Sequence, residues 1–447
     1  MTDTIAAIAT AMGRSGVGVV RVSGSKVSNI ATSILGALPK PRYATYGVFK
    51  NIQGNAIDQG IALYFNGPHS FTGEDVLELQ GHGGPVVLQQ VLEAVVAAGA
   101  RMAKPGEFTE RAFLNGKMDL VQAEAVADLI DASSKQASRA ALHSLQGEFS
   151  KNTHRLVKAV IQARLFVEAA IDFPDEDIEF IETEKIQQKL KSIQAQLKQL
   201  YVAAQQGVLL QEGMTVVIVG LPNAGKSSLL NVLAAKDSAI VTDIAGTTRD
   251  VLRESIHLDG MPLHIVDTAG LRESADPIEQ EGVKRAKAAL DHADVVLLMI
   301  DAHTEQQDTL DQLRLSLPSS VLNNVPVIVV KNKIDLLEGS PLSDQQTLYI
   351  SVITNQGVDV LKQRLKKIAG FEHTTESVVS ARARHVHALQ QADHCIEHGL
   401  EQLQQQQASE LLAEDLRQAQ QHLNSITGEF SSDDLLGEIF SSFCIGK

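Results

Sequence analysis

The chain has 447 residues, more than a single hydrophobic core usually holds, and we expect about two to four domains. Hydrophobic residues make up 44% and charged residues 21%, proportions that favour folded domains over disorder. There are 39 Lys and Arg against 54 Asp and Glu, for a net charge of −15. This balance excludes a broadly phosphate-binding surface, since nonspecific nucleic-acid binding needs clustered cations; any nucleic acid would be held locally or by a partner.

Cysteine usage and hydropathy indicate the compartment. Cys395 and Cys444 are the only cysteines, which excludes a disulfide framework and suits a reducing environment. Met1–Thr4 lack the basic and apolar regions that begin a secretory signal. Apolar runs such as Val295–Ile300 are far shorter than the ~20 residues of a bilayer span. We expect a cytoplasmic protein, at most peripheral to a membrane and without stable membrane insertion.

Residues 1–117 have the pattern of an α/β domain. Short apolar or β-branched runs bounded by Gly, Asn and Pro predict strands at 17–22, 60–65 and 76–79. Apolar residues at helical spacing predict a helix between Gly84 and Gly99.

Residues 118–212 change to a helical composition, in which glycine is rare and Ala, Gln, Glu, Lys and Leu dominate. Between Ile186 and Leu200, apolar residues recur at steps of four, three, four and three, as on an amphipathic helix. Asp172–Asp177 combines a proline with clustered acidic side chains, which predicts a break between two long helices. Because the helical composition returns in 371–447, we expect one helical domain interrupted by an insertion.

The insertion, residues 213–370, alternates strand-like runs with helical segments, as a parallel sheet with crossover helices does. The predicted strands are 216–219, 263–266, 295–300, 327–330 and 348–351. The expected fold is therefore multidomain: an N-terminal α/β domain, a discontinuous all-α domain and an inserted domain with a mainly parallel sheet.

A phosphate-binding motif begins the insertion. Gly220-Leu-Pro-Asn-Ala-Gly225-Lys226-Ser227 follows a predicted strand and precedes a helical run, which is the context that G-x-x-x-x-G-K-[ST] requires. Its glycines let backbone N–H groups curl around phosphates, and the helix N-terminus adds its positive end. Lys226 would neutralise the β- and γ-phosphates, and Ser227 would ligate Mg²⁺.

Two later motifs indicate a guanine nucleotide. Asp267-Thr-Ala-Gly270 follows a strand, and its carboxylate suits Mg²⁺ binding through water. Asn332-Lys-Ile-Asp335 follows another strand, and Asp335 offers two acceptors to the paired N–H donors of guanine, which adenine lacks. We therefore expect GTP rather than ATP. The expected GTP-binding residues are Asn223, Ala224, Gly225, Lys226, Ser227, Ser228, Thr242, Asp243, Ile244, Ala245, Gly246, Thr247, Thr248, Asp267, Thr268, Ala269, Gly270, Asn332, Lys333 and Asp335.

Hydrolysis poses a separate question. Thr248, in the segment between the P-loop and Asp267, is expected to complete the Mg²⁺ shell in a switch loop. Leu271 stands where Ras-like proteins have a glutamine that orients the attacking water, and an aliphatic side chain cannot do so. Arg272, Glu273 and Glu279 are candidate replacements just downstream. The alternative is a slow GTPase that mainly binds nucleotide.

With these residues in view, the whole chain resembles the MnmE (TrmE) family of tRNA modification GTPases. The shared motifs, in chain order, are Gly-Val-Gly-Val-Val-Arg21, Ser70–Gly84, Pro105–Lys117, the Gly-Thr-Thr-Arg-Asp stretch of the insertion and the ending Phe443-Cys-Ile-Gly-Lys447. The first and last lie outside the insertion, so they distinguish this family from other GTPases.

The resemblance implies three domains: residues 1–117 like tetrahydrofolate-binding domains, a helical domain split into 118–212 and 371–447, and a Ras-like G domain at 213–370. It implies a GTP-hydrolysing component of a complex that adds an aminomethyl or carboxymethylaminomethyl group at C5 of the wobble uridine, position 34, of certain tRNAs. A tetrahydrofolate derivative, 5-formyl or 5,10-methylene, would supply the one-carbon unit. The implied partners are a second copy in a homodimer, tRNA and the FAD-dependent protein MnmG (GidA), in a heterotetramer or larger complex.

The resemblance also implies further site residues. Arg21, Glu78, Lys117 and Lys447 would contact the folate, whose glutamate tail favours cations and whose pterin ring can donate to a carboxylate. Cys444 would take part in the modification; the alternative is an ordinary thiol.

For hydrolysis, the resemblance implies a dimer of G domains with bound K⁺ in place of an arginine finger. The side chain of Asn223, the carbonyls of Thr242 and Ile244, and Thr247 would coordinate K⁺. Glu279 would orient the attacking water indirectly. Arg249 and Arg272 complete the catalytic candidates.

Weaker patterns leave alternatives open. His82, set among glycines, is either a turn residue or part of the folate site. Arg382, Arg384 and His385 are either a solvated helix face or a contact with tRNA or a partner. For function, the alternatives are a ribosome-assembly or regulatory GTPase, which would call for a basic RNA-binding segment, and a membrane-coupled GTPase, which would call for a spanning segment.

Overall fold

The computed structural model describes residues 3–172, 181–235, 253–258, 260–267, 289–304, 307–337, 339, 343–344, 347–371, 378–406, 409–429 and 433–446. Their contacts divide the chain into two compact units. The first contains residues 1–127, 153–158 and 417–447, and the second contains 128–152 and 159–416. The four domain ranges inferred from the sequence follow a different division, and their boundaries stay predictions.

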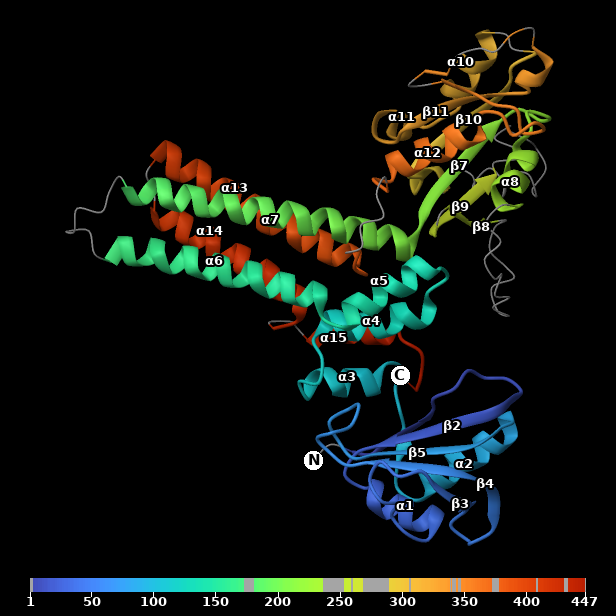
Figure 1. Cartoon of the computed structure of the whole chain (residues 1–447), viewed down its shortest axis with the longest axis vertical. Helices are drawn as coiled ribbons and strands as arrows, with labels where there is room; N and C mark the ends of the chain where they lie inside the picture. The colour runs from blue at the N-terminus through green and yellow to red at the C-terminus, as the bar shows by residue number, and fades with distance from the viewer. Residues whose placement is uncertain are drawn as a thin grey trace. The chain divides into compact units, whose positions relative to one another are not determined.

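A six-stranded sheet with the order β3-β4-β5-β2-β1-β6 dominates the N-terminal part of the first unit (Figure 1). Its strands pair antiparallel except for β1 and β6. The strands are β1 Ile5–Ile8, β2 Ser15–Ser23, β3 Thr45–Lys50, β4 Ala56–Phe65, β5 Val76–Gly83 and β6 Arg101–Met102. The sequence predicted the regions of β2, β4 and β5. It missed β1, β3 and β6.

Two helices, α1 (Val27–Leu35) and α2 (Pro85–Ala97), pack on this sheet and complete its hydrophobic core. Alternation along β5 shows the two faces: Leu77 and Leu79 are buried, whereas Glu78 between them is half-buried. α2 lies in the helix predicted between Gly84 and Gly99, and its first residue is Pro85, where the missing N–H is not needed.

The end of the chain also belongs to the first unit. α3 (Glu107–Leu114) and α15 (Asp433–Ser441) contribute to one hydrophobic cluster with the start of α4 (Leu120–Asp131), in which Phe440 lies 6.4 Å from Phe113 between ring centroids. Beyond α15, Ile445 forms a bridge with Pro105. Residues more than 300 positions apart in the sequence thereby meet in one unit.

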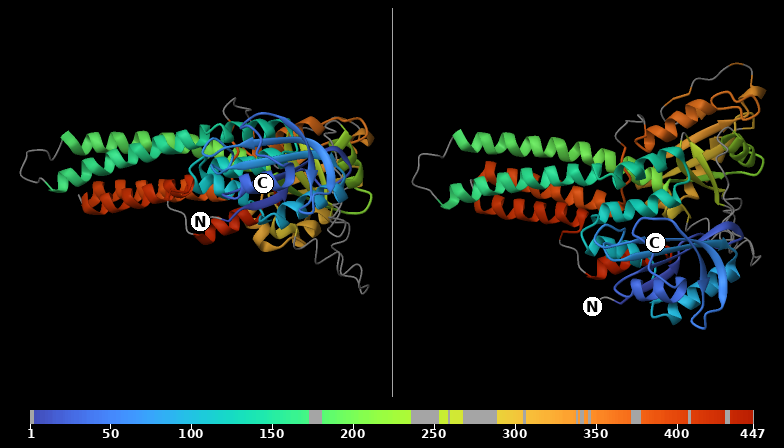
Figure 2. Two further views of the ribbon diagram at one scale, coloured as in Figure 1. Left: turned by 90° about the horizontal axis from the view of Figure 1, so that it is seen from below. Right: turned by 60° about the horizontal axis from the view of Figure 1, so that its bottom comes forward.

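Long helices make up much of the rest of the chain. They are α5 Lys135–Leu145, α6 Glu148–Asp172, α7 Ile181–Glu212, α13 Ala383–Gln406 and α14 Ser409–Thr427. Figures 1 and 2 both show α6, α7, α13 and α14 side by side. The five apolar residues of the predicted stripe between Ile186 and Leu200 are all buried on α7. α6 ends and α7 begins on either side of the predicted break, whose central residues 173–180 lie outside the described residues.

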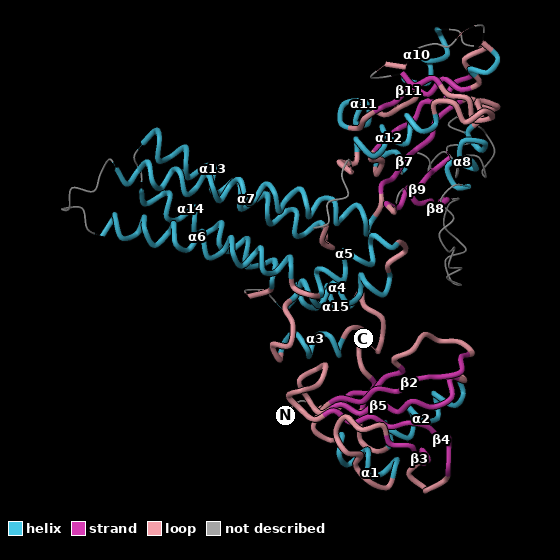
Figure 3. The backbone as a smooth tube through the Cα atoms, viewed as in Figure 1, coloured by secondary structure: helices cyan, strands magenta, loops and turns pink. Residues whose placement is uncertain are grey.

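The inserted domain has a six-stranded sheet with the order β12-β11-β10-β7-β9-β8 (Figure 3). All pairs are parallel except β8 with β9. The strands are β7 Met214–Gly220, β8 Arg253–Leu258, β9 Met261–Asp267, β10 Val295–Asp301, β11 Val327–Asn332 and β12 Thr347–Tyr349. The mainly parallel sheet is confirmed. β8 was not predicted, and β12 ends two residues earlier than expected.

Helices cover both faces of this sheet. Apolar residues of α8 (Lys226–Ala235) and α12 (Val358–Ile368) pack with Val216 and Ile218 on one face. α10 (Gln307–Leu315) and α11 (Ser319–Asn324) pack with Val217 and Val219 on the other. The sheet is therefore buried on both sides, which explains the nearly continuous apolar runs of its strands. No helix among the described residues is both long and apolar enough to cross a membrane.

Candidate functional site

The predicted nucleotide residues gather at the carboxyl edge of the inserted sheet. β7 leads into the P-loop, β9 ends at Asp267, β10 ends at Asp301 and β11 ends at Asn332. In parallel α/β sheets, ligands bind at this edge. The structure therefore brings together motifs that lie more than 100 residues apart in the sequence.

The P-loop has a backbone that only particular residues allow. Gly225 has φ +97°, and a Cβ there would lie 2.2 Å from Nδ2 of Asn332. Gly220 lies so close to β10 that a Cβ would be 2.3 Å from the Met299 carbonyl oxygen. Asn223 has φ +65°, a conformation that asparagine tolerates better than most residues. Both glycines of the motif are thus required by packing as well as by phosphate approach.

Lys226 and Ser227 begin α8, where unpaired backbone N–H groups favour an anion. The Lys226 ammonium donates to the carbonyls of Gly220, at 2.9 Å, and Leu221, at 3.3 Å, so it stays over the loop. The side chains of Asn223, Ser227 and Ser228 are exposed. Hydroxyl and amide oxygens are available there for cation binding, which fits the predicted roles of Ser227 and Asn223.

Asn332 joins the P-loop to the loop that follows β12. It is 3% exposed, and its Nδ2 donates to the Ala224 carbonyl at 2.9 Å while its Oδ1 accepts from the Val352 N–H at 3.2 Å. The sequence predicted Asn332 as a GTP-binding residue. The structure gives it a supporting contact that no local pattern shows, because its two partners come from other loops.

Asp335 is positioned by a residue outside its own motif. Ser351 Oγ donates to Asp335 Oδ1 at 2.5 Å, which orients the carboxylate predicted to read guanine. This role of the Ser351 side chain was not predicted from the sequence. A serine at the end of the fifth predicted strand was the available signal.

Lys333 forms an ion pair with Asp301, at 2.6 Å between Nζ and Oδ2. Burial opposes ionisation of Asp301, but the hydrogen bonds from Lys333 and from the His303 N–H outweigh it and lower the pKa of this carboxyl group. Lys333 itself has φ +68°, which is unusual for a residue with a long side chain. This strained backbone lies in the guanine motif, as strain at ligand sites often does.

The remaining predicted nucleotide residues lie outside the described residues. They are Thr242, Asp243, Ile244, Ala245, Gly246, Thr247, Thr248, Arg249, Thr268, Ala269, Gly270, Arg272 and Glu279, together with Leu271 and Glu273. Asp267 is placed at the end of β9, but its side chain is not described.

The predicted folate residues belong to the first unit. Arg21 on β2 and Glu78 on β5 are direct partners across the sheet, with 2.9 Å between guanidinium and carboxylate, and both are partly exposed. The Arg21 guanidinium also lies 5.6 Å from the centre of the Phe71 ring. Lys117 donates to the Pro68 carbonyl at 2.9 Å, in the same loop that carries Phe71. One loop thus connects three of the predicted positions.

The C-terminal residues return to this unit. Cys444 is exposed, and its carbonyl accepts from the Gly106 N–H at 3.4 Å. A Cβ at Gly446 would lie 2.3 Å from the Ile8 carbonyl oxygen, so the tail runs close to β1. Lys447, the fourth predicted folate contact, lies outside the described residues.

A network of ion pairs supports the same region and was not foreseen. Arg111 on α3 is 9% exposed and contacts carboxylates of Asp3, Glu74 and Glu107. Burial of Glu107 opposes its ionisation, yet hydrogen bonds from Arg101, the Lys104 N–H and Arg111 lower its pKa. The network ties α3 to the start of the chain and to the loop before β5. Its only sequence signal was the charged motif at 105–117.

The prediction of a solvated helix face at Arg382, Arg384 and His385 is wrong for Arg382 and His385. Arg382 pairs with buried Asp128 at 3.1 Å, and His385 is 1% exposed with its ring 5.3 Å from that of Phe149. These residues pack within the second unit, because the segment before α13 runs between α5 and α7.

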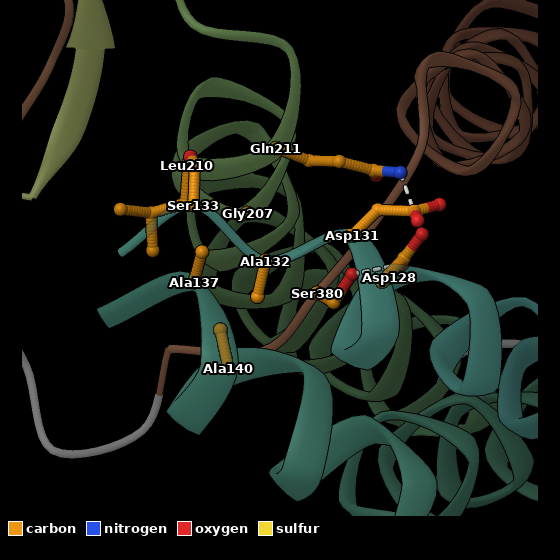
Figure 4. Close-up of a pocket in the computed structure, with 10 residues that line it drawn as sticks. All are labelled: Asp128, Asp131, Ala132, Ser133, Ala137, Ala140, Gly207, Leu210, Gln211 and Ser380. Carbon is orange, nitrogen blue, oxygen red and sulfur yellow. Dashed lines mark hydrogen bonds between the residues drawn. The ribbon is translucent and has the colours of Figure 1, made fainter. Parts of the chain in front are cut away.

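A cavity of about 200 Å³ lies beside this ion pair (Figure 4). Figure 4 shows Gln211 and Ser380 directed at Asp128; Gln211 donates to it at 2.6 Å and Ser380 hydrogen-bonds to its other oxygen. Both carboxylate oxygens are therefore engaged by the protein, and we assign Asp128 to joining α4, α7 and the segment before α13.

Comparisons with known proteins cover the whole chain. The sequence matches the family "GTP-binding protein TrmE N-terminus" over residues 4–117 and the family "MnmE helical domain" over residues 120–444. Among solved structures, Era in complex with MgGDPNP and nucleotides of 16S ribosomal RNA is 28% identical, with a TM-score of 0.29 over 41% of this chain and 66% of that chain.

Three curated relatives carry the name "tRNA modification GTPase MnmE". They come from Hydrogenovibrio crunogenus, Saccharophagus degradans and Coxiella burnetii, and are 58%, 58% and 56% identical to this chain. Each alignment covers 100% of this chain and 99% of the relative. At this identity over the full length, the chain belongs to the MnmE family of tRNA modification GTPases.

Proposed function

We propose that this chain is the GTP-hydrolysing component of a complex that adds an aminomethyl or carboxymethylaminomethyl group at C5 of the wobble uridine of certain tRNAs. The observation that carries the proposal is the identity of 56–58% with tRNA modification GTPases over both units and the inserted domain. The names of these three relatives give no support to the alternative, a ribosome-assembly or regulatory GTPase.

GTP and Mg²⁺ would bind at the P-loop and at the ends of the neighbouring strands. The amide nest of the P-loop and the Lys226 ammonium hold the phosphates, and Asp335, oriented by Ser351, accepts from guanine. Ser227 and Thr248 would ligate Mg²⁺, and Asp267 would act on it through water. When bound, Mg²⁺ neutralises charge on the phosphate oxygens.

K⁺ and a second copy of the chain would supply further stabilisation of the charge that develops during hydrolysis. Asn223, exposed on the P-loop, would contribute its side-chain oxygen to K⁺, and the other ligands would be Thr242, Ile244 and Thr247. Glu279 orients water indirectly, in place of the glutamine that Leu271 replaces. Arg249 and Arg272 remain further catalytic candidates.

The first unit binds the one-carbon donor. Arg21, Glu78, Lys117 and Lys447 contact a tetrahydrofolate derivative, and the exposed thiol of Cys444 takes part in the modification. Partial exposure of the Arg21–Glu78 pair supports this assignment, since both side chains can exchange part of their mutual contact for a ligand. The FAD-dependent partner MnmG (GidA) and tRNA complete the complex.

Nucleoside analysis of tRNA from a deletion strain tests the function. Wobble uridines should lose their C5 groups, the unaltered gene should restore them, and Lys226→Ala should not. Lys191→Ala, an exposed lysine on α7, is the matched control and should restore them fully. Normal C5 modification in the deletion strain would show that the proposal is wrong.

The cation role has its own test. GTP hydrolysis should be much faster in K⁺ than in Na⁺, and both Asn223→Ala and Asn223→Gly should remove that difference. Glycine adopts φ +65° without strain, so a shared loss in both variants isolates the side chain from the backbone. Equal rates of the unaltered chain in the two salts would remove K⁺ from the mechanism.

A further inference from the structure

An exposed imidazole in the first unit is held by a buried carboxylate. His82, near the end of β5, has a side chain 69% exposed, whereas the side chain of Asp58 on β4 is 8% exposed. His82 Nδ1 lies 2.7 Å from Asp58 Oδ1, and the His82 backbone N–H donates to Asp58 Oδ2 at 2.8 Å. One carboxylate therefore holds both the ring and the backbone of the same residue.

Glycines make this arrangement sterically accessible. A Cβ at Gly81 would lie 2.4 Å from Asp58 Oδ2, and one at Gly83 would lie 1.9 Å from the Ser15 hydroxyl oxygen. At Gly60, two residues after Asp58, a Cβ would lie 2.1 Å from the Gln80 carbonyl oxygen. Side chains at these positions would displace the groups around the pair, so the glycines around His82 have a specific structural reason.

The contacts decide which ring nitrogen carries the proton. Burial disfavours the charged form of Asp58, but the hydrogen bonds from the backbone and ring of His82 outweigh it and lower the pKa of this carboxyl group. An ionised carboxylate can only accept, so Nδ1 is the donor. The neutral ring then has its lone pair on Nε2, for which the structure records no partner among the residues it describes.

A carboxylate–imidazole pair of this kind is a proton acceptor of fixed orientation. The carboxylate selects the tautomer and stabilises the imidazolium that forms when Nε2 takes a proton. A group that served only to fasten the end of β5 would need the backbone contact alone. It would not need an aromatic base presented to solvent.

We propose that the Asp58–His82 pair is an acid–base group of the modification reaction, acting on the uracil ring. This inference rests on the proposed function. Substitution at C5 replaces a C–H bond with a C–C bond. As the ring attacks the one-carbon unit, the bond from that carbon to the nitrogen of its folate donor breaks and the electron pair stays on nitrogen. One proton must then leave the ring for each group added. Nε2 of His82 accepts that proton, the electron pair of the C–H bond returns to the ring, and Asp58 balances the positive charge on the imidazolium.

The position on β5 agrees with this role. Glu78, a proposed folate contact, and His82 lie on the same strand four residues apart, which corresponds to roughly 13 Å along the strand. A one-carbon donor held at one end of this distance and a base at the other would leave room for a nucleobase between them.

The test compares His82→Asn with His69→Asn in the full-length chain with its partner and tRNA. The amide of asparagine replaces Nδ1–H as a donor to Asp58 but has no basic nitrogen. His69 is an exposed histidine of the same unit whose ring has no recorded partner among the described residues. Initial rates of C5 modification, GTP hydrolysis and thermal unfolding are measured for each.

The expected result is a loss of about 10²-fold in the modification rate of His82→Asn, within the usual contribution of general acid–base catalysis. GTP hydrolysis and the unfolding temperature should stay at the values of the unaltered chain, and His69→Asn should behave as unaltered. A modification rate of His82→Asn within about threefold of normal would overturn the proposal. So would a loss that follows unfolding.

Asp58→Asn adds a readout that a purely structural role would not change. The modification rate should fall, because an amide N–H facing the ring favours the wrong tautomer, while GTP hydrolysis should stay at the value of the unaltered chain. Of the elements packed around His82, β4 contributes Asp58 as the charged group and β2 contributes the uncharged Ser15. An unchanged modification rate would refute the acid–base role. Absence of modified uridine with the unaltered chain would instead refute the proposed function itself.

Discussion

Asn332 is the buried link between the P-loop and the loop after β12, and its removal should weaken GTP binding strongly. In Asn332→Ala, the carbonyl of Ala224 and the N–H of Val352 both lose their partner. Asn332, Ala224 and Val352 are 3%, 2% and 5% exposed, so solvent does not readily replace the lost bonds.

The magnitude follows from these two groups. Leaving one buried polar group unsatisfied costs about 1–3 kcal/mol, so the pair costs about 2–6 kcal/mol. If about 3 kcal/mol of this acts on the nucleotide-bound conformation, GTP affinity falls roughly 10²-fold. The remainder appears as lower stability of the inserted domain.

Titration with a fluorescent GTP analogue and thermal unfolding of the full chain measure both parts. Asn323→Ala, an exposed asparagine on α11, serves as the matched control and should change neither. The reasoning is refuted if Asn332→Ala binds GTP within about threefold of the unaltered chain and unfolds at the same temperature, because the two contacts would then carry no energy.

Three further predictions follow from particular contacts. Gly207→Ala on α7 would place a Cβ 2.1 Å from the Val379 carbonyl oxygen, so the free energy of unfolding should fall by about 1–3 kcal/mol. Gly437→Ala on α15, where no atom lies within 4 Å of the new Cβ, should raise it slightly. Chemical denaturation measures both changes, and two changes of the same sign would contradict this reasoning. Asp301→Asn removes a carboxyl group whose pKa is lowered on folding, so the variant should be less stable than the unaltered chain at pH 7. This difference in unfolding free energy should shrink as the pH falls below about 4, where the unfolded chain takes up the proton first. A difference that grows towards low pH would contradict the prediction. Arg21→Ala should weaken binding of a formyl-folate by at least about tenfold in calorimetric titration, since a charge-assisted contact is lost. Arg14→Ala, which changes an exposed arginine just before β2, should leave the affinity unaltered. Equal affinities of Arg21→Ala and the unaltered chain would place the folate site elsewhere.

Local motifs in the sequence indicated the nucleotide chemistry because phosphate and guanine recognition depend on short, contiguous segments. The P-loop, Asp267 and Asn332–Asp335 each follow a strand whose apolar run is visible in the sequence, and the structure confirms those strands. The amphipathic stripe of α7 was equally clear, because its period reflects burial of one helix face. Short or edge elements such as β1, β6 and β8 were missed, since two to six residues are too few to leave a periodic signal.

Tertiary structure alone decided which side chains act on one another. Ser351 orients Asp335, Asn332 holds Ala224 and Val352, and Asp58 holds His82, each across a separation of 16 to 108 residues. Hydrogen bonds of this kind depend on strand order and loop approach, which composition and spacing do not encode. The sequence by itself determined the family, the nucleotide and the division into α/β and helical parts, because these depend on local patterns. The fold decided the hydrogen-bond partners of His82, Asn332 and Asp335, because a carboxylate or amide finds its partner only after distant strands are paired.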